Sequence, residues 1–293
     1  MPIRQLGYVH WETPDLAAWE DFATNVLGFM PTKGPDPDAL YFRWDERPYR
    51  LVLTESSEKK IGALGFEVAD DVELAATADV LRANGHDVCV ATDDEARQRL
   101  ATGLLRFKDP AGIPVEIFYG PILNHERIVT PLVSSFVTEN MGLGHVVLGC
   151  PDVASSQHLY RDVLGFHRRN TMRLMMPGAE HAVDMCFLGC NERHHSVGIV
   201  GVPFPGILAH MMVEVATIDD VGMALDRCAE RNVPIQASLG RHTNDRMLSF
   251  YCGAPDGVGV EVGWGGLHIA DASKETTYEI TKSSFWGHKQ ASK

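Results

Sequence analysis

The 293-residue sequence lacks long apolar runs and has fewer basic than acidic side chains. No window approaches the roughly 20 consecutive apolar residues that a membrane-spanning helix needs. No basic opening segment leads into an apolar stretch, so we expect neither a signal peptide nor a membrane anchor. We therefore expect a cytoplasmic protein. The net charge of −13 argues against a nucleic-acid or anionic-membrane partner, because both attract basic surfaces.

Cysteine is also scarce, with six residues scattered along the chain. Cys186 and Cys190 lie four residues apart, but a zinc site would need a second Cys or His pair at matching spacing, and none follows. In a long chain with no sign of export, free buried thiols are favoured over disulfides. The sequence therefore predicts neither a disulfide framework nor a cysteine-based zinc site.

The sequence contains a long internal repeat. Residues 4–29 read RQLGYVHWETPDLAAWEDFATNVLGF and residues 141–166 read MGLGHVVLGCPDVASSQHLYRDVLGF, and the two align without a gap. In each copy the pattern predicts a short strand, a helix capped by Asp and a glycine at the helix end. The two copies differ at one position that bears on function: the second copy has His145 where the first has Tyr8.

Two further echoes extend the repeat. GFEVADDVELAATADVLRANGHDV and MVEVATIDDVGMALDRCAERNVPI each predict a strand and an amphipathic helix, and DPAGIPVEIFYG and APDGVGVEVGWG each predict a turn and a closing strand. With the alternating runs between them, each half contains two strand-helix-strand-strand-strand modules. We predict an α+β fold of two similar domains, residues 1–133 and 134–293. The connection at 121–140 and the tail from about residue 270 fall outside the modules.

Three polar residues interrupt apolar runs of the second half. His145 and His210 lie in the opening strands of its two modules, and Glu261 lies in its last strand. Burying a carboxylate without a cationic partner costs on the order of several kcal/mol, so a positive group should lie near Glu261. Two neutral imidazoles and one carboxylate on neighbouring strands match the facial triad of non-haem Fe(II) enzymes, which leaves three octahedral positions open.

The duplication argues against a purely structural role for these histidines. A single histidine in a strand is more often a hydrogen-bonded core residue than a ligand. The matching positions of the first half are Tyr8, Ala63 and Glu116, so that half keeps the glutamate without the histidines. Ten of the 13 histidines follow residue 140. We therefore predict a metal site in the second half; a site around His10 is the weaker alternative, because no partner imidazole is evident.

Two polar segments supply further candidates near this site. In CNERHHSVGIV the strand period sends His194 and His195 to opposite faces, so only one of them enters a cavity easily. Just before the last strand, LGRHTNDRMLSFYCG supplies four more: His242, Asn244, Asp245 and Tyr251. Taken alone, that segment fits a solvated polar loop equally well. Beside a metal, its side chains would act in acid-base chemistry and orient ligands and substrate.

These motifs resemble the type I extradiol catechol dioxygenases of the vicinal oxygen chelate superfamily, and most closely the two-domain 2,3-dihydroxybiphenyl 1,2-dioxygenases. The similarity runs over nearly the whole chain, through RFKDPAGIPVEIFYG, GLGHVVL, YRDVLGF, CNERHHS, VEVGWGG and SSFWGHK in order. Motifs this long and this ordered are specific. The resemblance implies the vicinal oxygen chelate fold of paired βαβββ modules, also called the glyoxalase/bleomycin resistance/dioxygenase fold. It also implies an enzyme that cleaves a catechol beside its diol with O2.

The resemblance further implies a set of functional residues. It implies an Fe(II) cofactor in the second domain and an amino-terminal domain without metal, although the ligand types alone do not separate Fe(II) from Mn(II). The implied metal ligands are His145, His210 and Glu261. The implied catalytic groups are His195 as acid-base residue, His242 and Tyr251 as hydrogen-bond partners of the substrate, and Asp245 in support of them.

The distal part of such a substrate needs apolar walls. By position the candidates are Leu148, Met175, Phe187, Gly198 and Phe204, with Asn244 as a polar contact, and each fits an ordinary core position as well. No extra basic cluster marks a carboxylate-bearing substrate. We predict cleavage of a 3-substituted catechol, with 2,3-dihydroxybiphenyl favoured over 1,2-dihydroxynaphthalene, alkylcatechols and steroid-derived catechols.

Two other functions suit this fold less well. A glyoxalase-like isomerase with zinc or nickel would want a fourth protein ligand, but Tyr8 and Ala63 stand where a symmetric ligand set would need one. A non-catalytic protein that sequesters an aromatic compound would need no metal triad, so the presence of all three candidate ligands disfavours this function. The family resemblance also implies a homo-oligomer, often an octamer.

Overall fold

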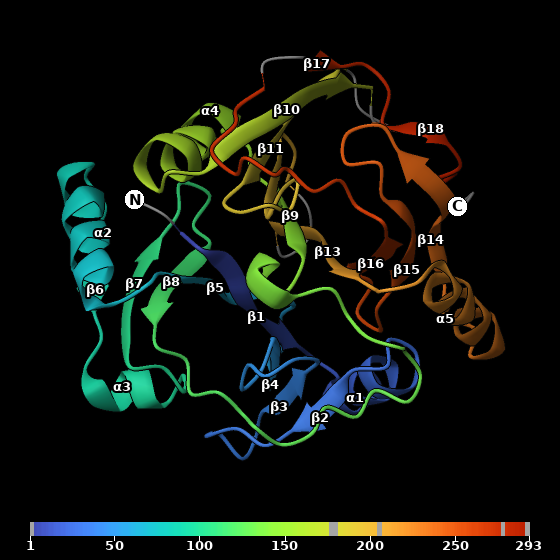
Figure 1. Cartoon of the computed structure of the whole chain (residues 1–293), viewed down its shortest axis with the longest axis horizontal. Helices are drawn as coiled ribbons and strands as arrows, with labels where there is room; N and C mark the ends of the chain where they lie inside the picture. Colours follow the sequence, from blue (N-terminus) through green and yellow to red (C-terminus); the bar gives the residue numbers. More distant parts are fainter. Residues whose placement is uncertain (1–2, 176–180, 204–206, 277–278, 291–293) are drawn as a thin grey trace.

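The structure is a computed structural model that describes residues 3–175, 181–203, 207–276 and 279–290. The first half of the chain forms one sheet (Figure 1). Its strands are β1 (Gln5–Thr13), β2 (Met30–Thr32), β3 (Leu40–Arg43), β4 (Leu51–Glu55), β5 (Lys60–Glu67), β6 (Cys89–Val90), β7 (Gly103–Lys108) and β8 (Pro114–Tyr119). They are ordered β2-β3-β4-β1-β5-β8-β7-β6 across the sheet.

The second half forms a separate, larger sheet. Its strands are β9 (His145–Gly149), β10 (His167–Leu174), β11 (Val183–Gly189), β12 (Val197–Val200), β13 (Leu208–Glu214), β14 (Ile235–His242), β15 (Leu248–Gly253), β16 (Gly259–Trp264), β17 (Glu279–Ile280) and β18 (Ser284–Trp286). They are ordered β17-β10-β11-β12-β9-β13-β16-β15-β14-β18. The tail thus adds a short strand to each edge of this sheet.

Strand pairing confirms the four predicted βαβββ modules. In the first half β1 pairs antiparallel with β5 and parallel with β4, and β5 pairs parallel with β8. In the second half β9 pairs in the same way with β13 and β12, and β13 pairs with β16. The opening strands of the modules therefore form the centre of each sheet, as expected for the vicinal oxygen chelate fold.

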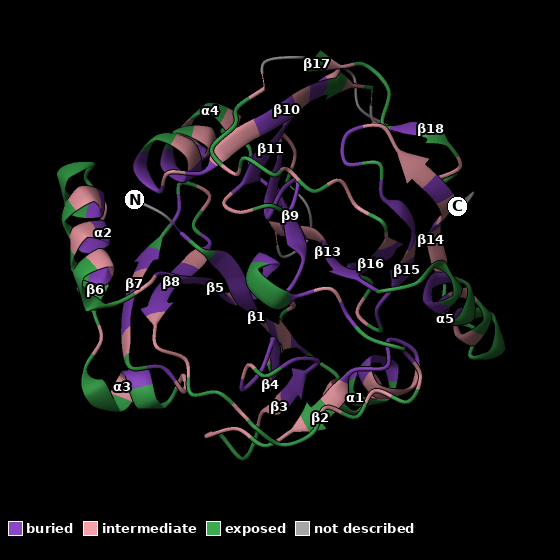
Figure 2. Ribbon diagram, in the orientation of Figure 1, coloured by how far each residue is buried: buried purple, intermediate pink, exposed green. Residues whose placement is uncertain are grey.

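The helices pack on the outside of the sheets and expose their outer faces (Figure 2). They are α1 (Leu16–Asn25), α2 (Asp71–Ala83), α3 (Asp93–Arg97), α4 (Val153–Gln157) and α5 (Ile218–Glu230). Asp15 and Asp152 cap α1 and α4, as the Pro-Asp repeat predicts. Gly28 and Gly165 have φ angles of 77° and 76°, a left-handed conformation that glycine adopts without steric cost. A π-helical turn, His158–Val163, and helix α3 were not expected from the sequence.

The two halves contact each other through the first strand and helix of one half, the first helical segment of the other, and the closing turns of both. The indole nitrogens of Trp11 and Trp19 donate to Asp256 Oδ2 at 2.7 and 2.8 Å. From the second half to the first, the Tyr160 hydroxyl donates to Asp109 Oδ2 at 3.2 Å. Each closing turn is therefore held by the other half, and the apolar core is continuous between them.

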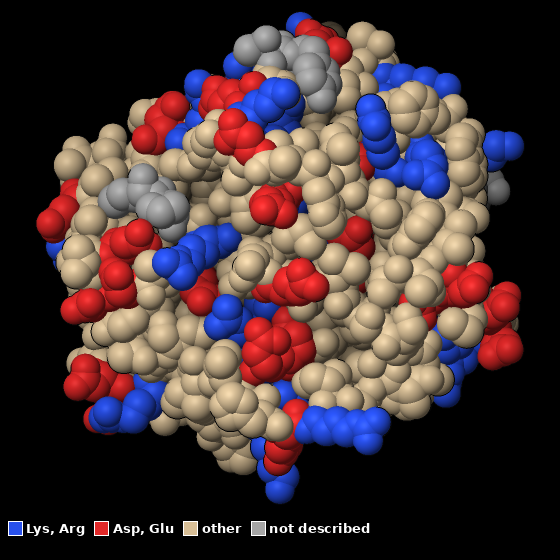
Figure 3. Space-filling view, in the orientation of Figure 1, with Lys and Arg blue, Asp and Glu red and all other residues tan. Residues whose placement is uncertain are grey.

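The surface carries charged side chains of both signs (Figure 3). On the face in Figure 3, acidic and basic side chains are interspersed. Within the described residues, no helix is long and apolar enough to cross a membrane.

The first sheet buries an ion pair whose loss should destabilise the fold. Arg50 is fully buried, and its Nε donates to Asp45 Oδ2 at 2.8 Å. Burial alone would raise the pKa of Asp45, but the Arg50 guanidinium holds it below its usual value. Because removal of one partner leaves the other charge buried, we expect Asp45→Asn to lower the free energy of unfolding by about 3–5 kcal/mol. Urea unfolding followed by circular dichroism measures it.

The matched control is Asp79→Asn, which removes an exposed ion pair with Arg82. Exposed pairs contribute little, so this variant should unfold like the unchanged protein. Equal effects of the two substitutions would contradict the importance of the buried pair.

Candidate metal centre

Three central strands of the second sheet bring His145, His210 and Glu261 together. Met212 on β13 pairs with His145 on one side and with Glu261 on the other. His210 lies two residues before Met212 on the same strand. Residues directly opposite or two apart share a face of a sheet, so all three side chains point to one side. The predicted assignment of these residues to neighbouring strands therefore agrees with the geometry.

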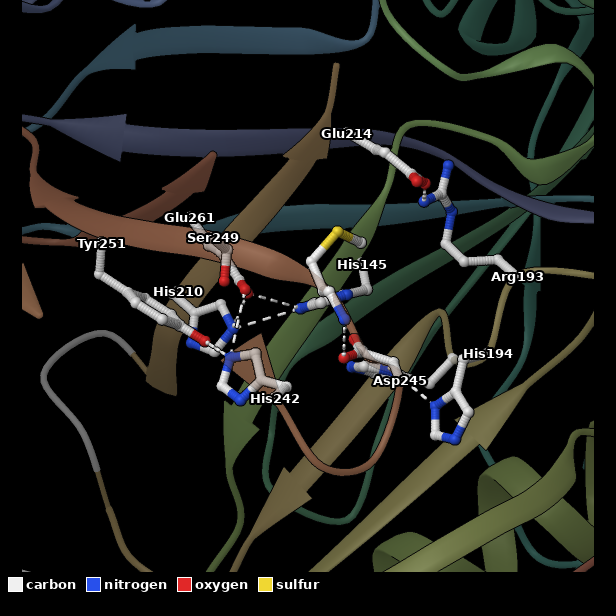
Figure 4. A network of polar contacts seen from close by, with 12 residues as sticks. His145, Arg193, His194, His210, Glu214, His242, Asp245, Ser249, Tyr251 and Glu261 are labelled. Carbon is white, nitrogen blue, oxygen red and sulfur yellow. Dashed lines mark hydrogen bonds and ion pairs between the residues drawn. The ribbon is translucent and has the colours of Figure 1, made fainter. Parts of the chain in front are cut away.

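The donor atoms of these residues form a compact triangle. His145 Nε2 is 3.2 Å from Glu261 Oε2, His210 Nε2 is 3.3 Å from the same oxygen, and the two nitrogens are 3.3 Å apart. In Figure 4 the three side chains point toward one another. Atoms about 2.1 Å from one octahedral ion lie about 3 Å apart, so this triangle fits ligands that share a metal.

The electrostatics of the triangle also suit a cation. Burial alone would raise the pKa of Glu261, but its contacts with the imidazoles hold it well below the usual value. Burial lowers the pKa of His145 to about 4, so this ring is neutral near pH 7 and can coordinate a metal. Within the described chain, Glu261 forms no ion pair with Lys or Arg; its buried Oε1 accepts no hydrogen bond, and the nearest imidazole nitrogen to that oxygen is His242 Nε2 at 3.4 Å. The residues present fit a divalent metal.

His242 and Tyr251 lie on one side of the triangle (Figure 4). His242 Nε2 is 2.7 Å from the Tyr251 hydroxyl and 3.4 Å from Glu261 Oε1. Burial opposes protonation of His242, but the Glu261 carboxylate outweighs it and raises the pKa of His242 to about 9. Burial raises the pKa of Tyr251 well above its usual value. Together they offer polar hydrogens next to the proposed metal.

His195 lies against the triangle and stacks on His145, with ring centroids 4.0 Å apart. Burial lowers the pKa of His195 well below its usual value. Its Nδ1 is 3.9 Å from Asp245 Oδ2, beyond hydrogen-bond distance, and 3.1 Å from His194 Nδ1. The two histidines precede β12 in irregular backbone, and both are buried; only His195 lines the main cavity described next.

The triangle opens on a main cavity of about 440 Å³, which also receives His195, His242, Asn244, Asp245 and Tyr251. One wall is apolar and consists of Val147, Met172, Leu174, Met185, Phe187 and Val200. The opposite rim is polar and consists of Gln236, Ser283, Ser284 and Gln290. A cavity of this size, with one apolar wall and converging polar groups, suits a small aromatic ligand.

The apolar residues expected from the sequence fall in different places. Phe187 and Met175 line the main cavity, and Met175 is 63% exposed at its edge. Leu148 does not line it, because neighbouring residues of a strand point to opposite faces and its predecessor Val147 faces the cavity instead. Gly198 pairs with Val147 and Phe187 and so faces the same side as they do, but their side chains cover it and it does not line the cavity; an added Cβ would be 2.9 Å from Val147 Cγ2. Phe204 lies outside the described residues.

The first half has a different arrangement at the matching positions. Gly65 pairs with Tyr8 and with Glu116, as Met212 does with His145 and Glu261. The Tyr8 hydroxyl donates to the Glu116 carboxylate, whose oxygens also accept from Arg99 Nε at 2.9 Å and Arg106 Nε at 3.0 Å. Two guanidinium groups thus provide the positive charge that this buried carboxylate needs.

Several contacts around the site were missed by the sequence analysis. The tail supplies His288, which stacks on His242 with centroids 4.0 Å apart, and Ser283, whose carbonyl is 3.1 Å from His242 Nδ1. Arg193 pairs with buried Glu214. The repeat gave no signal for the tail residues, because the tail has no counterpart in the first half. The polar run NERHH contains Arg193 and could have indicated that this residue lies near the site.

Comparisons with known proteins show which sequences and structures this chain resembles. The dihydroxybiphenyl dioxygenase BphC D1 model matches residues 6–55, and the glyoxalase/bleomycin resistance protein/dioxygenase superfamily model matches residues 142–262. An iron-dependent extradiol dioxygenase of Rhodococcus jostii (strain RHA1) is 41% identical over 98% of this chain and 97% of its own. A biphenyl-2,3-diol 1,2-dioxygenase of Paraburkholderia xenovorans (strain LB400) is 40% identical over 99% and 96%. The crystal structure of BphC, a halotolerant catechol dioxygenase, matches with a TM-score of 0.90 at 36% identity, over 99% of this chain and 95% of that one.

Proposed function

The chain belongs to the extradiol dioxygenases of the glyoxalase/bleomycin resistance protein/dioxygenase superfamily, and from this we propose that its second half cleaves a 3-substituted catechol. The chain is thus an iron-dependent enzyme that opens a catechol ring beside its two hydroxyl groups with O2. The observation that carries the proposed site is the triangle of His145 Nε2, His210 Nε2 and Glu261 Oε2 at the floor of the main cavity.

In this proposal His145, His210 and Glu261 hold the iron. When bound, Fe(II) supplies a centre at which the catechol oxygens and O2 meet and electron density passes from ring to oxygen. The carboxylate adds one negative charge and the imidazoles add none, so the site keeps a net positive charge that attracts a catecholate. We propose that the first half binds no metal, because Arg99 and Arg106 already neutralise Glu116.

His195 acts as the acid-base residue. Its ring is buried and neutral near pH 7, because burial lowers its pKa, so it can accept a proton from a catechol hydroxyl in the main cavity. The same ring then returns that proton during ring opening. Stacking on His145 fixes the plane of the imidazole and keeps it next to the reacting oxygens.

His242 and Tyr251 orient the substrate. The 2.7 Å contact between His242 Nε2 and the Tyr251 hydroxyl keeps both groups on one side of the metal ligands, where they can bond to a substrate oxygen. Asp245 accepts from the Met247 amide at 3.0 Å and so fixes the turn that follows His242 and carries Asn244. Asn244 lines the cavity with an Oδ1 that has no partner among the described residues.

The apolar wall sets the substrate class. A catechol with a second ring at position 3 would place that ring against Val147, Met185 and Phe187, away from the polar rim. We therefore propose 2,3-dihydroxybiphenyl as the substrate, with 1,2-dihydroxynaphthalene, alkylcatechols and steroid-derived catechols as the alternatives. The product from the biphenyl diol would be 2-hydroxy-6-oxo-6-phenylhexa-2,4-dienoate.

The proposal is tested with protein reconstituted with Fe(II) without oxygen, then given 2,3-dihydroxybiphenyl and air. We expect one O2 consumed per catechol and a yellow ring-fission product. Comparison of kcat/KM across a panel of 3-substituted catechols then ranks the substrates. Absence of oxygen uptake with every catechol of the panel would refute the proposed reaction.

We also propose two domains, residues 1–133 and 134–293. The backbone of Val137 donates to Glu214 at 2.8 Å, which supports a boundary just before this segment. We propose a homo-oligomer on the family resemblance and on the half-exposed aromatic residues Phe285 and Trp286. A cytoplasmic location is supported by the cysteines, all six of which are free.

A further inference from the structure

His194 makes a direct contact with the proposed acid-base residue. Its Nδ1 lies 3.1 Å from His195 Nδ1, and the two rings are perpendicular. Two ring nitrogens form a hydrogen bond only if one of them carries the proton, so this contact couples the tautomers of the two rings. His194 does not line the main cavity and cannot contact a substrate there.

The other nitrogen of His194 lacks a protein partner. Its Nε2 is buried and accepts or donates no hydrogen bond to the described residues, and the same holds for His145 Nδ1. Both residues, with His195 and Asp245, line a small cavity of about 10 Å³ behind the metal triangle. This volume is about that of one water molecule, and buried polar atoms are normally satisfied by protein or water. The small cavity can thus accommodate one water molecule.

We propose that His194 is a positioning residue that fixes the tautomer of His195, with a water as the partner of His194 Nε2. The inference rests on the proposed function, since it assigns His195 its catalytic role. To accept a proton at Nε2, His195 must carry its own hydrogen on Nδ1 and donate it to His194 Nδ1. His194 then carries a hydrogen on Nε2, which needs the water as acceptor.

Asp245 favours the same arrangement. Its Oδ2 is 3.9 Å from His195 Nδ1, and a carboxylate on that side favours the proton there. In Figure 4 Asp245 and His194 lie together on the side of the triangle away from His242 and Tyr251. The tautomer of His195 is therefore set from behind, and the substrate side of the ring stays free.

An outer cavity of about 450 Å³ allows a direct test. It shares His194, Leu267 and His268 with the small cavity, and its wall includes Arg169 and Lys274. Exposed residues such as His268 line it, so small molecules can enter from solvent. Imidazole can therefore reach the space that His194→Ala leaves, whereas the ring of His194→Phe fills that space.

The experiment compares His194→Ala and His194→Phe with the unchanged holoenzyme. We expect full iron content in both, an anaerobic Kd for 2,3-dihydroxybiphenyl within about twofold, and kcat lowered about 10–100-fold. Added imidazole should restore at least tenfold in His194→Ala and nothing in His194→Phe. The control His268→Gln, at an exposed position of the same cavity, should keep the original kcat.

The possible results separate this inference from the proposed function. A holoenzyme that consumes O2 while His194→Phe keeps its kcat overturns the role of His194 and leaves the proposed reaction standing. Loss of iron in both variants, or failure of imidazole to rescue His194→Ala, also overturns it, because His194 would then be structural. A holoenzyme with full iron and no oxygen uptake refutes the proposed reaction itself.

Discussion

Replacing His145 by alanine is expected to abolish iron retention and, with it, ring cleavage. His145 supplies one corner of the donor triangle, and its Nε2 is 3.2 Å from Glu261 Oε2. Changes to groups that only orient metal ligands cost about 10–100-fold in affinity, so loss of a ligand should exceed about 100-fold. Iron content after desalting measures this directly.

Thermal unfolding gives a second measurement of the same loss, independent of activity. A metal at about 100 times its Kd stabilises the folded state by about 2.7 kcal/mol, so Fe(II) added without oxygen should raise the melting temperature of the unchanged protein. It should not raise that of His145→Ala. The control is His158→Ala, an exposed histidine of the same half, which should bind iron normally. One retained iron per chain in His145→Ala would contradict the assignment.

The fold could be predicted from the sequence because the strand-helix-strand-strand-strand pattern occurs twice in each half. Strand alternation and the Asp and Gly signals at helix ends are local, so they survive without knowledge of tertiary contacts. The π-helical turn at His158–Val163 is different. It keeps the apolar spacing of a helix while shifting the hydrogen bonds by one residue, and a residue pattern does not register such a shift.

The metal triangle could be predicted for a related reason. His145 and Tyr8 occupy equivalent positions of one strand pattern, so the packing of this strand does not by itself require a histidine. The neutralisation of Glu116 could not be predicted in this way. Arg99 follows helix α3, an element without counterpart in the second half, and only the folded chain brings its side chain to the carboxylate.

The two-residue period of a strand predicts only part of the arrangement of His194 and His195. The expectation that only one ring enters the main cavity agrees with the structure, but both residues precede β12 in irregular backbone. The direction of a strand residue gives the face it occupies, not its hydrogen-bond partner. The 3.1 Å contact between the two rings therefore had no signal in the sequence.

Replacing His195 by alanine should leave the iron in place and lower kcat about 10²–10⁴-fold, the usual contribution of a positioned acid-base group. His195 stacks on His145 but contributes no atom to the triangle of His145, His210 and Glu261. The substrate would still bind in the main cavity, where the apolar wall remains unchanged. The catechol proton would lose its acceptor, and the opening ring would lose its donor. Stopped-flow absorbance with oxygenated buffer separates catechol binding from formation of the yellow product.

The comparison between His195→Ala and His145→Ala decides between chemistry and metal binding. Both residues are buried to the same degree, at 2% exposure, so their truncation removes similar packing. If His195 served mainly to hold the ligands, the two variants would lose iron equally and the proposed role would be wrong. If it acts on protons, iron content and anaerobic catechol binding stay near those of the unchanged enzyme while kcat falls. His195→Ala then differs from His194→Ala in degree, because the first removes the group that accepts the proton and the second removes only the group that orients it.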